Sequence, residues 1–196
     1  MTALPTSNWR PTLTITHPSL AVAADACAKM IADMERQADP YWLTLLGNPG
    51  VGKTMLARQT FTQSRKCNPG DLTSVWVTGT GLYNPDNRRP RCVWFDAPEF
   101  KDRMLGGEYD LPEYLRADYL VVIDDLGAGK DTRDNALADG LYRLANQRMH
   151  RWMIWTSNLA LRDVAEKIDA RVSSRLIRDN NRLVTITAPD YALVKK

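Results

Sequence analysis

GNPGVGKT, residues 47–54, is a complete match to the pattern G-x-x-x-x-G-K-[ST]. The apolar run YWLTLL (41–46) precedes it and a helical pattern follows it from Thr54, which is the context that a phosphate-binding loop requires. Glycines let backbone N–H groups curve around phosphate oxygens, and the helix N-terminus adds a partial positive charge. The sequence therefore predicts a nucleoside triphosphate site built from eight residues: Gly47, Asn48, Pro49, Gly50, Val51, Gly52, Lys53 and Thr54.

A second apolar run, VVIDD (121–125), ends in two acidic residues. A strand of this kind is buried on both faces, and it delivers Asp124 to its carboxyl end, where open α/β sheets bind ligands. There the Thr54 hydroxyl and the Asp124 carboxylate would hold Mg²⁺, and Lys53 would reach the β and γ phosphates. Asp125 would polarise an attacking water. Because no third group is present to accept phosphate, we expect the reaction to be hydrolysis.

Asn158 and two arginines complete the candidate catalytic set. Asn158 ends the strand-like run RWMIWTSN, where a carboxamide could orient water beside the γ-phosphate or could simply cap the next helix. Arg171 and Arg175 are four positions apart and share one helical face, which could be catalytic or merely solvated. An arginine supplied to the γ-phosphate of a neighbouring copy would neutralise charge in the transition state.

The rest of the chain alternates strand-like and helix-like segments. Expected strands are 41–46, 72–77, 91–95, 119–124, 151–158 and 182–188, and TLTIT (12–16) reads as an arm or an edge strand. Helical patterns fill most of the intervals, including 18–39, 54–66, 111–117 and 132–149, and Asp96 is a candidate helix cap. This alternation predicts an α/β fold with a doubly wound, mostly parallel sheet of about five strands and helices on both faces.

Composition limits the class of protein. The 196 residues are 44% hydrophobic and 25% charged, as in a globular domain with one core. No apolar stretch is long enough to span a membrane, and the N-terminus does not resemble a secretory signal. The three cysteines, Cys27, Cys67 and Cys92, form no C-x-x-C pair and fit a reducing compartment, so we expect a cytoplasmic protein.

Charge is unevenly distributed along the chain. Residues 96–139 hold 12 acidic and 5 basic side chains, whereas residues 143–182 hold 9 basic and 4 acidic ones. Opposite charge on two halves of one domain suits head-to-tail self-association, although two separately solvated faces would give the same pattern.

Together these motifs resemble the AAA+ ATPases, and within them the DnaC-type helicase loaders and the related IstB transposition ATPases. The resemblance covers about residues 19–191 and rests on GNPGVGKT, VVIDDLGA (121–128), the step Asn146-x-Arg148, TSNL (156–159) and ARVSSRL (170–176). It implies that Asn158 is the sensor 1 residue, that Arg175 is the arginine finger acting in trans, and that Arg171 matches a second family arginine.

The sequence also departs from these families. About 18 residues precede the first helix, so residues 1–18 are expected to be an arm in place of the usual helicase-binding domain, followed by an ATPase core over 19–196 with little or no C-terminal lid. Residues 78–92 look like a surface insertion. Its arginines lie near aromatic residues and, with two basic residues after the acidic pair, are candidate DNA contacts: Arg88, Arg89, Arg91, Lys130 and Arg133.

The resemblance implies a slow ATPase of phage or mobile-element type that binds ATP and Mg²⁺ and assembles head-to-tail into a ring or spiral. Its expected role is to regulate loading of a replicative helicase onto single-stranded DNA, with activity that depends on assembly or DNA. The main alternative is an IstB-like ATPase that coats duplex DNA and recruits a transposase. A small-molecule kinase and an ATP-binding switch with negligible turnover are the remaining alternatives.

Overall fold

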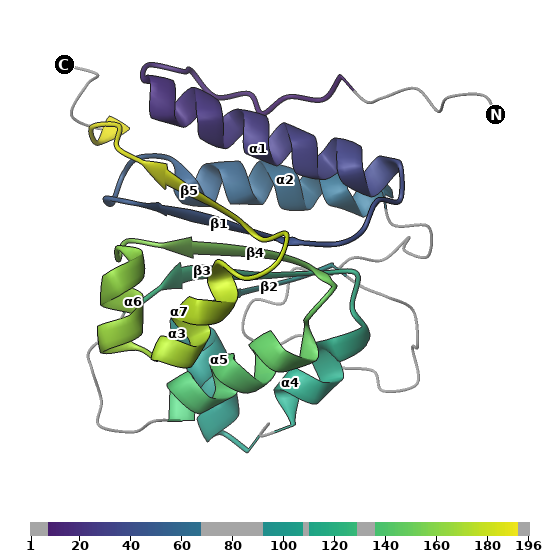
Figure 1. Cartoon of the computed structure of the whole chain (residues 1–196), viewed down its shortest axis with the longest axis vertical. Coiled ribbons are helices and arrows are strands. Elements are labelled where there is room, and N and C mark those ends of the chain that lie inside the picture. Colours follow the sequence, from purple (N-terminus) through teal and green to yellow (C-terminus); the bar gives the residue numbers. More distant parts are fainter. Residues whose placement is uncertain (1–7, 68–91, 108–109, 129–135, 192–196) are drawn as a thin grey trace.

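A five-stranded parallel sheet organises the molecule (Figure 1). The computed structural model describes residues 8–67, 92–107, 110–128 and 136–191. The strands lie in the order β2-β3-β4-β1-β5, and every neighbouring pair is parallel. They are β1 (Trp42–Gly47), β2 (Cys92–Asp96), β3 (Leu120–Leu126), β4 (Trp152–Ser157) and β5 (Arg182–Ile186). The predicted α/β class and the doubly wound sheet are confirmed.

Helices cover both faces of this sheet (Figure 1). One face carries α1 (Pro18–Glu35) and α2 (Lys53–Cys67). The other carries a larger set: α3 (Ala97–Leu105), α4 (Leu111–Tyr114) with the 3₁₀ turn η1 (Leu115–Ala117), α5 (Ala136–Gln147), α6 (Leu161–Lys167) and α7 (Ala170–Leu176).

Alternation along each strand builds the two cores. Successive strand side chains point to opposite faces, so Leu43 of β1 packs with α1 and α2 whereas Trp42 packs with the helices of the other face. On β3, Val122 packs in the core with α1 and α2, and Ile123 packs in the core of the other face. Because both faces are buried, β3 is apolar from Leu120 to Ile123 and β4 is apolar from Trp152 to Trp155, as is typical of a parallel sheet.

Local sequence signals set several element boundaries. The Asp96 carboxylate accepts a hydrogen bond from the backbone N–H of Glu99 at 2.7 Å, so the predicted cap of α3 is confirmed. The His17 side chain caps α1 in a similar way, with Pro18 in the first turn. Gly47, at the end of β1, passes so close to β5 that a Cβ there would lie 2.4 Å from the carbonyl oxygen of Ile186.

The structure corrects two predictions made from the sequence, and others concern residues that it does not describe. For residues 12–16, predicted as an arm or an edge strand, the edge strand is wrong: the segment from Asn8 to His17 contains no strand. The backbone N–H of Thr12 donates to the Gln59 side chain of α2 and not to the sheet. Cys92, taken as the last residue of a surface insertion, belongs to β2 and is fully buried. The expected strand 72–77 and the remainder of 78–92 lie outside the described residues. No helix in the described ranges is long and apolar enough to cross a membrane.

Candidate functional site

Lys53, the first residue of α2, joins the glycine-rich loop to the end of β4 through its side-chain hydrogen bonds. Its Nζ donates hydrogen bonds to the carbonyl oxygens of Gly47 at 2.8 Å and Asn48 at 2.7 Å, and to Oδ1 of Asn158 at 2.7 Å. The side chain is buried, and burial lowers its pKa while the nearby carboxylates of Asp125 and Asp124 oppose that shift. A cation is therefore fixed where the helix N-terminus also favours an anion.

Asp124 and Thr54 place two oxygen ligands side by side. The Thr54 hydroxyl donates to Oδ1 of Asp124 at 3.1 Å, and the Thr156 hydroxyl donates to the same oxygen. The described residues contain no cluster of three or more His, Cys, Asp or Glu side chains that could hold a metal. Mg²⁺ does not need such a cluster, since it keeps several waters and commonly binds one or two protein oxygens with substrate phosphates. The Thr54–Asp124 pair fits that requirement.

Asp125 follows Asp124 in β3, has a positive φ of 56°, and makes different contacts from the Thr54–Asp124 pair. Its carboxylate accepts a hydrogen bond from Nδ2 of Asn158 at 2.5 Å, and its backbone N–H donates to the Thr156 hydroxyl at 2.8 Å. Burial and the charge of Asp124 raise the pKa of Asp125, and Lys53 acts in the opposite direction. A half-buried carboxylate with a raised pKa is a better proton acceptor than an exposed one.

Strand order explains why Asn158 reaches both partners. β4 lies between β1 and β3, and Ser157 is in register with Leu46 on one side and with Leu126 on the other. The residue that follows Ser157 therefore lies between the glycine-rich loop and the acidic pair. Lys53, Asn158 and Asp125 form one continuous chain of hydrogen bonds across the carboxyl edge of the sheet.

A cleft of about 700 Å³ opens over the glycine-rich loop. Its lining comes from the segment before α1 with the first turns of that helix, the glycine-rich loop with the start of α2, and the segment after β5. Asp125 of β3 and Asn158, which follows β4, complete it. The lining includes Leu13, Val51, Thr54, Asp190 and Tyr191. This volume lies within the range that small-molecule ligands occupy.

Arg175 lies at the opposite end of the sheet. Its Nη1 lies 2.8 Å from Sδ of Met149, and with Trp42 and His150 it lines a small cavity of about 60 Å³. Trp42 is the first residue of β1, whereas Gly47 is the last residue of that strand and the first of the glycine-rich loop. At about 3.3 Å per residue, Trp42 and the loop are separated by roughly 16 Å. Arg175 does not reach the cleft of its own chain.

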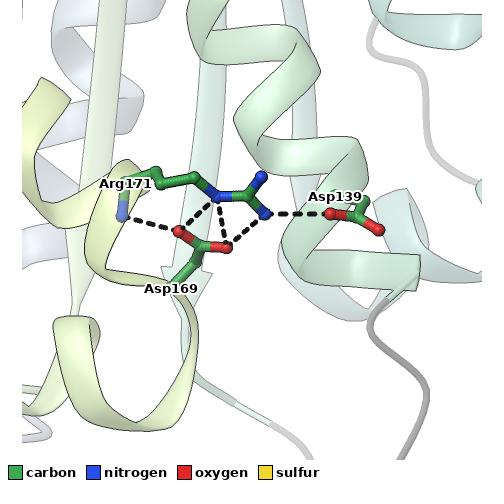
Figure 2. A network of polar contacts seen from close by, with 3 residues as sticks. All are labelled: Asp139, Asp169 and Arg171. Carbon is green, nitrogen blue, oxygen red and sulfur yellow. Dashed lines mark hydrogen bonds and ion pairs between the residues drawn. The ribbon is translucent and has the colours of Figure 1, made fainter.

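Arg171 is held by two carboxylates on the outer face of α7. Figure 2 shows its guanidinium between Asp169 and Asp139, with Nη2 at 2.7 Å and 3.0 Å from the respective carboxylates. The guanidinium also stacks over the ring of Tyr142 at 4.2 Å. These hydrogen bonds raise the pKa of Arg171 and lower that of Asp169. The structure thus holds Arg171 against α5, and Arg171 does not line the cleft.

Sequence reasoning missed three residues of this edge. Thr156 bridges Asp124 and Asp125, although the sequence interpretation singled out only Asn158 from TSN. Asp96, interpreted only as a helix cap, is in register with Asp124, and its charge also raises the pKa of Asp125. No sequence motif includes Asp190, so its place could not be predicted from the sequence. Asp96, like Asp124, is an acidic residue that follows an apolar strand-like run, and that pattern could have identified it. The candidate DNA contacts, Arg88, Arg89, Arg91, Lys130 and Arg133, lie outside the described residues.

No protein-family model matches the sequence, and no curated protein matches it either. Solved structures do. The DnaC helicase loader aligns with a TM-score of 0.65 and 20% identity over 90% of this chain and 94% of that chain. DnaI aligns with a TM-score of 0.67 and 19% identity over 91% of this chain and 87% of that one.

A replication initiator, DnaA bound to AMPPCP and single-stranded DNA, aligns with a TM-score of 0.66 and 15% identity. The match covers 90% of this chain and 49% of the initiator, so this chain spans about half of that protein. At these identities the likeness concerns the arrangement of helices and strands. The chain therefore shares the fold of the DnaC helicase loader and of DnaI.

Proposed function

We propose that this protein is an ATPase that binds ATP with Mg²⁺, assembles head-to-tail and regulates loading of a replicative DNA helicase onto single-stranded DNA. One observation carries the proposal. Lys53, Thr54, Asp125 and Asn158 come from three strand ends and line one cleft. Asn158 is hydrogen-bonded to both Lys53 and Asp125, and Thr54 is hydrogen-bonded to Asp124. The same fold in the DnaC helicase loader and in the AMPPCP-bound DnaA supports it.

Each residue of the cleft has a distinct proposed task. The backbone N–H groups of residues 47–54 and the Lys53 ammonium bind the phosphates, so a phosphate oxygen replaces one of the carbonyl or amide oxygens that Lys53 now contacts. The Thr54 hydroxyl and the Asp124 carboxylate hold Mg²⁺, which neutralises phosphate charge when it is bound. Asp125 accepts a proton from water, and Asn158 keeps that carboxylate oriented.

Arg175 is proposed to act on a neighbouring copy. Because it lies at the amino edge of the sheet, it can meet a cleft at the carboxyl edge only if that cleft belongs to another molecule. A head-to-tail contact between copies brings these two edges together and repeats into a ring or a spiral. Arg171, fixed by Asp139 and Asp169, is proposed to position α7 and Arg175 rather than to contact phosphate.

Mixing two inactive variants tests this arrangement. Arg175→Ala keeps the cleft but lacks the finger, and turnover is expected to fall by roughly 10³-fold or more. Lys53→Ala lacks nucleotide binding but keeps the finger. An equal mixture should recover about a quarter of the parent activity, since that fraction of interfaces pairs a competent cleft with a competent arginine. ATPase rates are measured at high protein concentration with single-stranded DNA.

Arg162→Ala is the matched control for the mixing experiment. Arg162 is an exposed arginine of α6 whose ion pair with Glu166 is local, so its loss should leave turnover unchanged. Full activity of assembled Arg175→Ala would show that the finger is wrongly assigned. Failure of the mixture to recover activity would argue against action between copies.

The helicase-loading role extends the ATPase proposal to partners. It includes a cytoplasmic location, an N-terminal arm over residues 1–18 that grips the helicase, and DNA contacts by Arg88, Arg89, Arg91, Lys130 and Arg133. Basic side chains with nearby aromatic rings suit single-stranded DNA, whose bases stack and whose phosphates attract cations.

Affinity capture from the host lysate, in ATP and in ADP, tests the partner. We expect a hexameric replicative helicase to be enriched in ATP, and the enrichment to disappear for Lys53→Ala because the nucleotide controls the contact. Mass spectrometry identifies the captured proteins. Recovery of a transposase, or of no helicase in either nucleotide, would reject the loading role and leave the ATPase proposal standing.

A further inference from the structure

The segment after β5, residues 187–191, ends in two residues that line the proposed nucleotide cleft, Asp190 and Tyr191. At its beginning the backbone N–H of Thr187 donates to the Ser19 hydroxyl at 3.0 Å. At its end the backbone N–H of Tyr191 donates to the carbonyl oxygen of Gly50 at 3.0 Å. Ala188 between these anchors is buried. The segment is therefore fixed against α1 on one side and against the glycine-rich loop on the other.

The Asp190 carboxylate of this segment lies directly against Gly50 of the glycine-rich loop. A Cβ placed on Gly50 would lie 2.2 Å from Oδ1 and 2.5 Å from Oδ2 of Asp190, so the carboxylate occupies the space that any other side chain at position 50 would fill. Gly50 also has a positive φ of 76°, which glycine adopts without strain. Only glycine at this position lets Asp190 approach the loop so closely.

A carboxylate against Gly50 is unexpected in a site for polyphosphates, because it adds negative charge to a cleft that would bind an anion. Three charged side chains line it: Lys53, Asp125 and Asp190. Lys53 contributes one positive charge against two negative ones, so the described lining is net negative although its proposed ligand is a polyanion. Asp190 is half-buried, and charges in such positions are screened by solvent less than exposed ones.

We infer that Asp190 limits the affinity of the cleft for nucleotide, because its carboxylate holds a negative charge against the phosphate-binding loop and repels every polyphosphate that enters. The inference rests on the proposed function, since it concerns the same cleft. Its ligand class is a nucleoside triphosphate, and the repulsion acts on the phosphates rather than on the base. The anchored ends of residues 187–191 keep the backbone of Asp190 at the loop.

Asp190→Asn tests the inference, because it removes the charge and keeps the shape of the side chain. We expect it to bind mant-ATP about tenfold more tightly than the parent at low salt, from the Coulomb energy of one charge a few ångströms from phosphate in a partly screened site. At 1 M salt, where the Debye length is about 3 Å, the difference should fall to about threefold or less. Fluorescence titration measures both affinities.

Asp190→Glu is the matched control. It keeps the charge near the loop and should stay within about threefold of the parent affinity, since the added methylene changes the packing but not the repulsion. Inorganic tripolyphosphate, measured by competition with mant-ATP, should gain the same factor in Asp190→Asn as ATP does. A gain restricted to ATP would show that Asp190 acts on the nucleoside and would overturn the inference.

The remaining outcomes separate the inference from the proposed function. If the parent binds mant-ATP and Asp190→Asn binds it no more tightly, the inference is wrong and the nucleotide site stands. If Asp190→Asn binds more weakly, Asp190 contributes attractive contacts and the inference is again overturned. If neither the parent nor Asp190→Asn binds any triphosphate, and neither differs from Lys53→Ala, both the inference and the proposed function fail.

Discussion

Asp125→Asn is expected to lower ATP turnover by roughly 10²–10⁴-fold while ATP binding is kept, because an amide cannot accept the proton that the attacking water gives up. The structure gives two reasons to assign this task to Asp125 and not to Asp124. Asp124 already accepts two hydroxyl donors, from Thr54 and Thr156. The Asp125 carboxylate contacts Asn158, which also contacts Lys53.

The pKa of Asp125 strengthens the expectation. Burial and Asp124 raise it, so the carboxylate is more basic than an exposed aspartate. Turnover should accordingly decline as the pH falls through this raised pKa, because the protonated acid cannot act as a base. In Asp125→Asn the residual rate should lose this acidic limb. Steady-state rates across pH, with nucleotide affinity measured separately, check both statements.

Asp102→Asn is the control for the change in charge. Asp102 is an exposed residue of α3, so its substitution also removes one negative charge but leaves the cleft intact. Its turnover should match that of the parent. A loss of nucleotide affinity in Asp125→Asn equal to its loss of turnover would show that Asp125 serves binding rather than chemistry.

Arg148→Ala is expected to destabilise the fold by about 3–5 kcal/mol, the range that large core truncations and broken buried polar networks reach. Arg148 is fully buried between α5 and β4. Its Nη1 donates to the carbonyl oxygens of Leu115, at 3.0 Å, and Asp118, and its Nη2 donates to that of Trp152 at 2.5 Å. One guanidinium thereby satisfies carbonyl groups in the segment before β3 and at the first residue of β4.

The charge of this group persists at neutral pH. Burial lowers the pKa of Arg148 to about 9, against the raising effect of Asp118, and a guanidinium with that pKa remains protonated at pH 7. Truncation therefore leaves several buried carbonyl oxygens without a donor and opens a cavity as well. For a domain of ordinary stability, about 5–15 kcal/mol, this is a large share of the total.

Urea unfolding followed by tryptophan fluorescence measures the effect. Arg151→Ala is the control, since Arg151 lies three residues away, is exposed and should change the free energy of unfolding by no more than about 0.5 kcal/mol. Arg148→Lys should fall between them, because one ammonium reaches fewer carbonyl oxygens than the planar guanidinium does. A loss below 1 kcal/mol for Arg148→Ala would show that water replaces the donor at no cost.

The features of the fold that could be predicted from the sequence are those whose interacting groups lie within a few residues of one another. GNPGVGKT predicts its own loop because glycine at positive φ and a helix N-terminus act over a few residues. VVIDD predicts a buried parallel strand because apolar residues on both faces allow little else. The cap at Asp96 follows from a hydrogen bond that spans three residues. For such features the interacting groups are neighbours in the chain.

The sequence by itself therefore determined the α/β class, the glycine-rich loop between a strand and a helix, and the acidic residues of β3. Only the tertiary structure decided that β4 lies between β1 and β3, and this order puts Asn158 between Lys53 and Asp125. Only the tertiary structure decided that the Asp190 carboxylate lies against Gly50, 140 positions earlier in the chain. It also decided that Arg148 donates to carbonyl oxygens before β3 and at the start of β4. These contacts depend on how whole elements pack, and no periodicity or spacing within one segment records which distant segment it will meet.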